Sequence, residues 1–224
     1  MTAIPTSPRP VGRAVVVLAG GDAVDPRLAP RLPDGATVIA ADSGLASAGP
    51  LGLTVDLLVG DLDSVDAALL AQARREGVPV EEHPTDKDRT DLAIAMDAAM
   101  SHRPDRIVVV GGHGGRLDHL LGNVALLASP AYADVEVVAL MGTACVTVVR
   151  GDEAAPTRLT GTVGDLVSLI AYHGSARGIT TSGLRFPVDA ADLPAGSSLG
   201  VSNEFAAPEA TVGLREGVLL AVQP

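Results

Sequence analysis

The chain has 224 residues, 47% of them hydrophobic and 19% charged, which is enough apolar material to bury a sizeable core. Its formal net charge of −11 argues against general binding to nucleic acid or to membrane surfaces, because both need a basic surface. The single cysteine, Cys145, excludes an intrachain disulfide and a thiolate zinc cluster. No signal peptide and no apolar stretch of about 18 residues is evident, so we expect a soluble, cytoplasmic protein without a membrane partner.

Residues 1–12 are rich in proline and small polar residues, and we expect a flexible tail there. The chain then alternates between short apolar runs, which predict strands, and segments with helical periodicity. The predicted strands are 14–19, 37–41, 55–59, 78–82, 107–110 and 135–140, and the predicted helices are 64–76, 91–101 and 117–128. Continuous apolar runs are typical of strands covered on both faces. We therefore predict a doubly wound, mostly parallel α/β domain over residues 13–142.

From residue 143 onward the pattern changes, and no segment has convincing helical periodicity. Short β-type runs at 145–149, 166–172, 197–202, 210–214 and 217–222 are separated by glycine, proline, aspartate and threonine. This spacing is typical of an all-β sandwich or barrel. We predict a β-sandwich domain over residues 143–224.

Glycines and charged residues gather where the predicted strands of the first domain end. They are Gly20-Gly21-Asp22, Asp42-Ser43-Gly44, the segment 60–64, the segment 83–91 and the segment 111–119. The sequence at the starts of the predicted strands is less distinctive. Because ligands of open α/β sheets bind beyond the carboxyl ends of the strands, we expect these residues to share one edge.

Four acidic side chains at this edge are the main chemical signal: Asp42, Asp61, Asp63 and Asp91. Without a counter-charge they would repel one another, and a divalent cation relieves that repulsion. Carboxylate oxygens suit Mg²⁺, Mn²⁺ or Ca²⁺, whereas zinc sites usually recruit histidine or cysteine. Glycine amides and the cations Lys87, Arg89 and Arg116 add a binding surface for phosphates. No P-loop is present, so the sequence predicts another type of nucleotide site, suited to phosphoryl or pyrophosphoryl transfer.

Seven motifs occur in an order that resembles the thiamine pyrophosphokinases (thiamine diphosphokinases). They are LAGGD, ADSG, DLLVGDLDS, DKDRTD, GGHGGRLDH, TSGLRFPV and GVSNEF. The resemblance implies an α/β ATP-binding catalytic domain followed by a β-sandwich that binds thiamine and dimerises. It implies a homodimer with active sites at the interface. It also implies Mg²⁺-dependent transfer of pyrophosphate from ATP to the hydroxyethyl group of thiamine, which gives thiamine diphosphate and AMP.

The resemblance also assigns roles by motif position. Mg²⁺ and the triphosphate would be held by Asp42, Asp61, Asp63 and Asp91, and the catalytic residues would be Asp61, Asp63, Lys87 and Asp91. Contacts with ATP would come from Gly20, Gly21, Ser43, Thr90, Gly112, Gly115, Arg116 and Asp118. Thiamine would meet Phe186, Ser202 and Asn203. Animal members often carry tryptophan in place of Phe186 and glutamine in place of Lys87, and an isolated phenylalanine in a β domain is often a core residue.

Two alternative functions stay open from the sequence. A hydroxymethyl-dihydropterin diphosphokinase-like enzyme would keep the acidic motifs and also release AMP, although the TSGLRF and SNEF elements favour thiamine. A non-catalytic thiamine or nucleotide sensor would retain the binding residues, but no acidic residue of the motifs is missing here.

Overall fold

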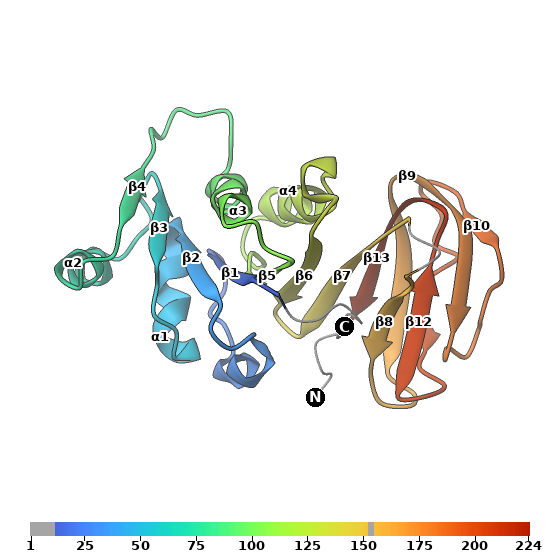
Figure 1. Ribbon diagram of the computed structural model, residues 1–224. Coiled ribbons are helices and arrows are strands. Elements are labelled where there is room, and N and C mark those ends of the chain that lie inside the picture. The colour runs from blue at the N-terminus through green and yellow to red at the C-terminus, as the bar shows by residue number, and fades with distance from the viewer. Residues whose placement is uncertain (1–11, 152–154) are drawn as a thin grey trace. The chain divides into compact units, whose positions relative to one another are not determined.

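The computed structural model describes residues 12–151 and 155–224, which form two compact units (Figure 1). The described residues 12–126 and 134–142 form one of them, called the α/β unit here; 127–133, 143–151 and 155–224 form the other, the β unit. Apart from Gly12, the predicted flexible tail lies outside the described residues. Within the described ranges, no helix combines the length and apolarity that crossing a bilayer requires.

The α/β unit is built on parallel strands in the order β4-β3-β2-β1-β5-β6. They are β1 (Ala14–Ala19), β2 (Thr37–Ala41), β3 (Leu57–Gly60), β4 (Val80–Glu82), β5 (Arg106–Gly111) and β6 (Glu136–Met141). The central strands β1 and β5 are almost wholly buried, which explains their continuous valine runs. The strand order reverses between β1 and β5, and such switch points are where open α/β sheets bind ligands.

Helices connect these strands, and their ends follow local capping rules. The α-helices are α1 (Ala48–Leu51), α2 (Ala67–Arg75), α3 (Asp91–Ser101) and α4 (Leu117–Leu127); 3₁₀ helices are η1 (Pro26–Arg31), η2 (Asp42–Ser47) and η3 (Pro130–Tyr132). Thr90 caps α3, because its hydroxyl accepts from the backbone N–H of Ala93. The second helix begins later than predicted because Asp66 is its cap and accepts from two backbone N–H groups. Buried residues of α3 pack on β1, β2 and β3.

The β unit is antiparallel in every pairing of its described strands. Its strands are β7 (Ala144–Arg150), β8 (Thr157–Thr160), β9 (Leu166–Ser182), β10 (Ala191–Leu193), β11 (Asn203–Glu204), β12 (Glu209–Gly213) and β13 (Glu216–Gln223). The order is β7-β13-β9-β12-β8, and β10 and β11 also pair with β9. Core residues on β9, including Val167 and Ile179, pack with Phe205 and Leu214. The chain is thus a mixed α/β protein with parallel and antiparallel strands.

Two sequence predictions in the β unit need correction. The strand predicted at 197–202 is a pair of turns, closed by hydrogen bonds from Leu199 N to Ser197 Oγ and from Val201 N to Ser198 O. The strand predicted at 166–172 continues to Ser182, because the left-handed backbone at His173 bends the strand without ending it. The short strands β8, β10 and β11 were not predicted, since they contain few apolar residues.

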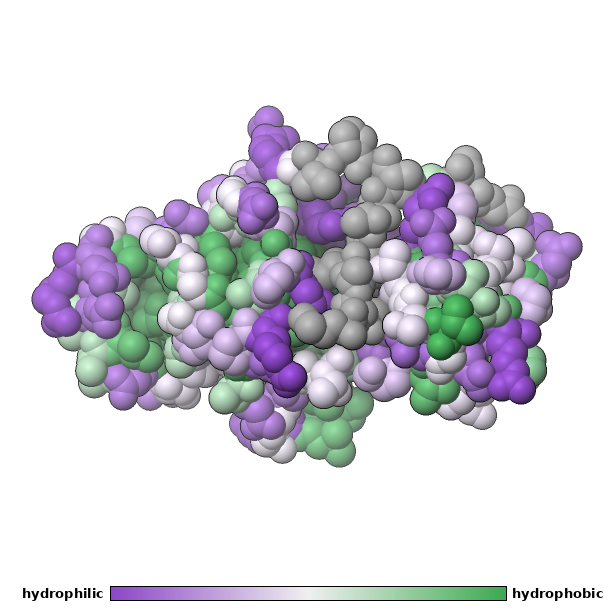
Figure 2. Space-filling view, turned by 90° about the horizontal axis from the view of Figure 1, so that it is seen from below, coloured by the Kyte–Doolittle hydropathy of each residue, from purple (hydrophilic) through white to green (hydrophobic). Residues whose placement is uncertain are grey.

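Exposed hydrophobic side chains are concentrated in the β unit. The large ones among the described residues are Leu117, Leu121, Val163, Leu166, Phe186, Val188, Leu199 and Val201. On the face in Figure 2, apolar residues (green) lie among hydrophilic ones (purple) over much of the surface. Single exposed apolar residues are common, but a local group of them often marks a binding site.

A glycine behind the site provides a test of the close packing between β1 and η2. A Cβ on Gly44 would overlap the carbonyl oxygen of Leu18, a backbone atom that cannot move aside cheaply. We expect Gly44→Ala to lower the free energy of unfolding by about 1–3 kcal/mol, measured by urea denaturation.

Gly49 is the matched control, because a Cβ there meets nothing within 4 Å. Gly49→Ala should leave stability unchanged or raise it by up to about 1 kcal/mol. Equal effects of the two substitutions would contradict the packing argument.

Candidate active site

A cleft of about 690 Å³ opens at the carboxyl ends of β1, β2, β3 and β5, within the α/β unit. The predicted site residues that line it are Gly20, Gly21, Asp42, Ser43, Asp61, Asp63, Lys87, Thr90, Asp91, Gly112, Gly115 and Arg116. The sheet therefore brings together residues from positions as distant as 20 and 116. Its location matches the edge where ligands of such sheets bind.

Three carboxylates from separate elements meet in this cleft. Asp42 follows β2, Asp61 follows β3 and Asp91 is the first residue of α3. One oxygen of each lies within 4.8 Å of the others. Like charges at this separation raise the energy of the ionised site, so the group favours a cation among its oxygens.

Asp42 is the most constrained member of this acidic cluster. It is 8% exposed, and its Oδ1 is buried without a hydrogen-bond partner among the described residues. Burial raises the pKa of the Asp42 carboxyl, against a hydrogen bond from the Ser43 backbone, and the charges of Asp91, Asp61 and Asp63 raise it further. Its backbone is left-handed, with φ at 48°. An unpartnered, buried carboxylate oxygen beside two further carboxylates is a donor set that fits a hard divalent cation.

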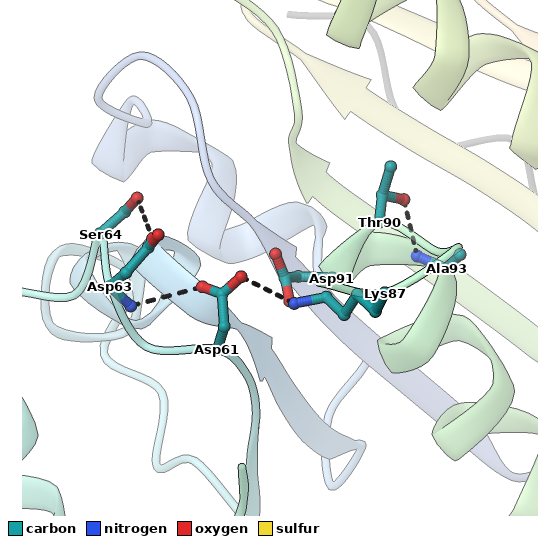
Figure 3. A network of polar contacts seen from close by, with 7 residues as sticks. All are labelled: Asp61, Asp63, Ser64, Lys87, Thr90, Asp91 and Ala93. Atoms are coloured by element: carbon teal, nitrogen blue, oxygen red, sulfur yellow. Dashed lines mark hydrogen bonds and ion pairs between the residues drawn. The ribbon is translucent and has the colours of Figure 1, made fainter. Parts of the chain in front are cut away.

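Lys87 supplies the positive charge that the cluster contains. Its ammonium lies 2.8 Å from Asp61 Oδ2 and 2.9 Å from Asp91 Oδ1 (Figure 3). The hydrogen bond from Lys87 lowers the pKa of Asp61 below its ordinary value. Burial opposes the charge on Lys87, but the contacts with Asp61 and Asp91 outweigh burial and raise the pKa of Lys87. Asp61 and Lys87 are therefore both held in their charged forms.

Asp63, the fourth predicted metal ligand, lies at the side of the cleft and is not one of the three clustered acids. Its carboxylate accepts a hydrogen bond from Ser64 Oγ at 2.8 Å, and its backbone N–H donates to Asp61 Oδ1 at 3.4 Å (Figure 3). Asp63 therefore orients Asp61 through the backbone, while its own side chain is exposed at the rim.

Two glycine turns form another wall of the cleft and are hydrogen-bonded to each other. The backbone N–H of Gly112 donates to Gly20 O at 3.0 Å, and that of Asp22 donates to His113 O at 2.9 Å. A Cβ on Gly21 would overlap the His113 carbonyl oxygen, so only glycine allows this approach. The turns form a surface of closely spaced backbone groups, suited to phosphate oxygens.

Arg116 and Asp118 follow these turns and form a surface ion pair of 2.6 Å. The hydrogen bond from Arg116 lowers the pKa of Asp118 to about 2. Arg116 lines the cleft, whereas Asp118 is not among its lining residues. The predicted ATP contact of Asp118 thus has no direct counterpart in the lining, and Asp118 instead orients Arg116.

Asn123 is a residue of the cleft that the sequence reasoning missed. It lies on α4, and its Nδ2 donates to the carbonyl oxygen of Gly112 at 2.8 Å. This bond ties the second glycine turn to the helix that follows it. In the predicted helix 117–128, this asparagine among leucines and valine is the signal that could have identified it.

A second cavity, of about 410 Å³ and mainly apolar, lies within the β unit. Phe186, Ser202 and Asn203, the predicted thiamine contacts, all line it. The Asn203 side chain holds the Phe186 backbone in both directions, accepting from Phe186 N at 3.1 Å and donating to Phe186 O at 2.9 Å. Phe186 is 59% exposed, so it is not a core residue. The Arg185 guanidinium lies 5.3 Å from its ring centroid.

The α/β fold, with an acidic cluster and two glycine turns at the carboxyl ends of its strands, is the arrangement of a nucleotide-binding class of protein, and the acidic cluster could hold a metal ion. Sequence comparison specifies the family. The model described as "Thiamin pyrophosphokinase, catalytic domain" matches residues 31–139, and "Thiamin pyrophosphokinase, vitamin B1 binding domain" matches residues 156–219. The chain belongs to the thiamine pyrophosphokinase family, which confirms the resemblance seen in its motifs.

Relatives and solved structures agree with this assignment. A protein of Bacillus subtilis (strain 168) named thiamine pyrophosphokinase is 24% identical over 185 residues, which cover 83% of this chain and 86% of the relative. A crystal structure of the B. subtilis thiamine pyrophosphokinase superposes with a TM-score of 0.82 at 23% identity, covering 94% of this chain and 98% of that one. The thiamin pyrophosphokinase of Geobacillus thermodenitrificans gives a TM-score of 0.79 at 26% identity, with coverages of 94% and 96%.

The burial of the Asp42 charge beside other carboxylates leads to a prediction about the stability of the metal-free protein. Asp42→Asn removes a buried charge, and asparagine tolerates the left-handed backbone of this position. We expect the variant's metal-free melting temperature to rise by about 2–4 °C, the shift that roughly 1 kcal/mol gives in a chain of this size. Differential scanning calorimetry in the presence of a chelator measures it.

The pH dependence of the same measurement follows from the sign of the shift. Because the folded-state pKa of Asp42 is raised, its destabilising effect is present above that pKa and is relieved as the pH falls through it. This component should be absent from Asp42→Asn. Asp63→Asn, outside the three-residue group, is the control and should shift the melting temperature less. A less stable Asp42→Asn would refute the argument.

Proposed function

We propose that the chain catalyses Mg²⁺-dependent transfer of the β,γ-pyrophosphoryl group of ATP to the hydroxyethyl oxygen of thiamine, producing thiamine diphosphate and AMP. One observation carries the proposal beyond family membership: three carboxylates, a lysine and two glycine turns converge on one cleft. These are the components that stabilise charge during phosphoryl transfer.

The acids would act together on the metal and the triphosphate. We assign Asp42, Asp61 and Asp91 to direct binding of Mg²⁺, and Asp63 to the rim beside them. When bound, Mg²⁺ neutralises phosphate charge and orients the phosphates for attack. The proposed ATP contacts are Gly20, Gly21, Ser43, Thr90, Gly112, Gly115 and Arg116, with Asp118 acting through Arg116. Lys87 and Asp61, Asp63 and Asp91 would be the catalytic residues.

The reaction forms a bond between the thiamine hydroxyethyl oxygen and the β-phosphorus and breaks the bond from that phosphorus to the α,β-bridging oxygen. AMP carries away the bridging oxygen. In a loose transition state the attacking hydroxyl needs little help from a base, so its proton can pass to water. The task of the chain is then to hold the phosphates in line, with the Lys87 ammonium within reach of their oxygens.

Thiamine would be held by the cavity of the β unit. Its apolar lining, the exposed Phe186 ring and the polar groups of Ser202 and Asn203 suit a flat, aromatic and partly polar ligand. We therefore propose that residues 13–142 are a doubly wound ATP-binding catalytic domain. Residues 143–224 would be a β-sandwich for thiamine binding and dimerisation.

We also propose a cytoplasmic homodimer with residues of both subunits at each active site. Exposed Leu117 and Leu121 on α4, and exposed Leu199 and Val201 in the β unit, supply apolar surface for a partner. The single cysteine, Cys145, is buried and cannot form a disulfide within the chain, which suits a reducing compartment.

An AMP-release assay tests the activity. The protein is mixed with ATP, Mg²⁺ and either thiamine or hydroxymethyl-dihydropterin, and AMP and the diphosphate product are quantified. We expect turnover with thiamine, none with the pterin alcohol, and loss of about 100-fold or more in Asp61→Asn, because several kcal/mol of charge stabilisation depend on this ligand. Turnover of the pterin alcohol alone, or normal activity of Asp61→Asn, would overturn the assignment.

A subunit-mixing experiment tests the shared active site. Asp61→Asn and Phe186→Ala are each expected to be inactive, and are unfolded and refolded together. If each site takes residues from both subunits, half of the dimers are mixed and each contains one intact site, so activity returns to about a quarter of wild type. Sites built within one subunit predict no recovery, and the separately refolded variants are the controls.

A further inference from the structure

Lys87 occupies the acidic cluster as a cation would. Its ammonium contacts Asp61 and Asp91, and the three side chains are only 14%, 11% and 26% exposed. This is unlike the other cations around the cleft. Arg89 and Arg116 are paired with Asp97 and Asp118, and those side chains are about half exposed or more. A sheltered ion pair is weakly screened and contributes more than a surface pair.

The same two carboxylates belong to the group proposed to hold the metal. A divalent ion among these oxygens would stand close to the ammonium and be repelled by it. Lys87 donates a hydrogen bond to Asp61 and forms an ion pair with Asp91 Oδ1, an atom that has no hydrogen-bond partner among the described residues. Asp42 Oδ1 is also buried without a hydrogen-bond partner there, and no contact joins it to Lys87. Lys87 therefore compensates the cluster incompletely and competes with any ion that would complete it.

The loop that carries Lys87 allows its side chain to move while the loop stays in place. Lys87 lies between β4 and α3, and its backbone N–H donates a hydrogen bond to the carbonyl oxygen of Thr85 at 3.2 Å. Two residues on, Arg89 bonds the carbonyl oxygen of Ala93 at 3.0 Å and pairs with Asp97 on α3. The flexible four-carbon stem of a lysine can then carry its charge a few ångström without moving the backbone.

We propose that Lys87 is a built-in counter-ion that the divalent cation must displace, so that the site takes its metal together with the nucleotide rather than from free solution. The triphosphate offers the displaced ammonium new oxygen partners, which free metal alone does not. The same lysine then lies at the phosphates when the metal is in place. This inference rests on the metal site of the proposed function and adds an order to its assembly.

Mn²⁺ binding, followed by electron paramagnetic resonance or calorimetry, tests the proposal without measuring turnover. Lys87→Met keeps most of the stem and removes the charge. In the absence of nucleotide we expect Lys87→Met to bind Mn²⁺ about tenfold more tightly than wild type. The variant no longer places a positive charge beside Asp61 and Asp91, two of the proposed ligands. With α,β-methylene-ATP, whose α–β bridge cannot be cleaved, this advantage should disappear or reverse.

Matched variants separate contact with the cluster from a change in net charge. Arg89 is a cation of the same loop, but it pairs with Asp97 and not with the three clustered acids. Arg89→Gln should therefore change Mn²⁺ affinity by less than about twofold. Lys87→Arg keeps the charge and should bind Mn²⁺ without nucleotide as weakly as wild type. If Lys87→Met does not fold by circular dichroism, Lys87→Gln carries the same test.

The outcomes distinguish this inference from the metal assignment. Equal Mn²⁺ affinity of wild type and Lys87→Met without nucleotide, with tight binding by both in its presence, overturns only the role of Lys87. Absence of Mn²⁺ binding in wild type and variants under both conditions overturns the proposed metal site as well.

Discussion

The repulsion between carboxylates at the ends of parallel strands is the constraint on which the site depends. A parallel sheet directs the carboxyl ends of its strands to one edge, so Asp42 and Asp61 become neighbours through the pairing of β2 with β3. The first turn of α3 adds Asp91 to them. This arrangement does not stabilise the fold, since each added carboxylate charge raises the electrostatic energy of the others. The arrangement makes chemical sense when a ligand completes it.

The surrounding backbone enforces this unfavourable proximity. Gly60 ends β3 with φ at 143°, and a Cβ there would lie 3.1 Å from both Asp42 Cβ and Asp91 Oδ1. Asp42, which faces Gly60, and Leu62, two residues after it, both have left-handed backbones. Two non-glycine residues with left-handed backbones at one edge of the sheet indicate strain, which the buried strands beneath hold in place. The core of β1 and β5 stabilises the scaffold that keeps the acids together.

Much of this site was predictable because strand ends are predictable. Valine-rich runs such as 14–19 and 107–110 specify buried parallel strands, and whatever follows them must lie at a shared edge. The sequence could not specify which acids approach closely: Asp63 shares a motif with Asp61 yet points to Ser64 instead of the cluster. Nor could it predict Asn123, whose role depends on a hydrogen bond across a loop.

The β unit was harder to predict, for a physical reason. Its strand β9 changes partners along its length, pairing with β13 near Ile170 and with β12 near Thr181. Local sequence does not encode this change of partner. His173 and Gly174 are residue types typical of a turn, but here they only bend the strand. The segment 197–202 shows the converse, since its apolar residues line a cavity instead of continuing a sheet.

Lys87 and Asp42 together show how a site can be folded before its ligands arrive and still need them. Lys87 donates a hydrogen bond to Asp61 and forms an ion pair with Asp91, so the loops are held around an internal positive charge. Asp42 receives no such partner among the described residues and stays buried at a cost. A cluster fully neutralised by lysines would be more stable but would bind a metal weakly, and a cluster without the lysine would have stronger repulsion among its carboxylates before the metal binds. In the observed cluster the single charge of Lys87 faces three carboxylates, and Asp42 Oδ1 and Asp91 Oδ1 have no hydrogen-bond partner among the described residues. The remaining negative charge favours binding of a cation together with its phosphates.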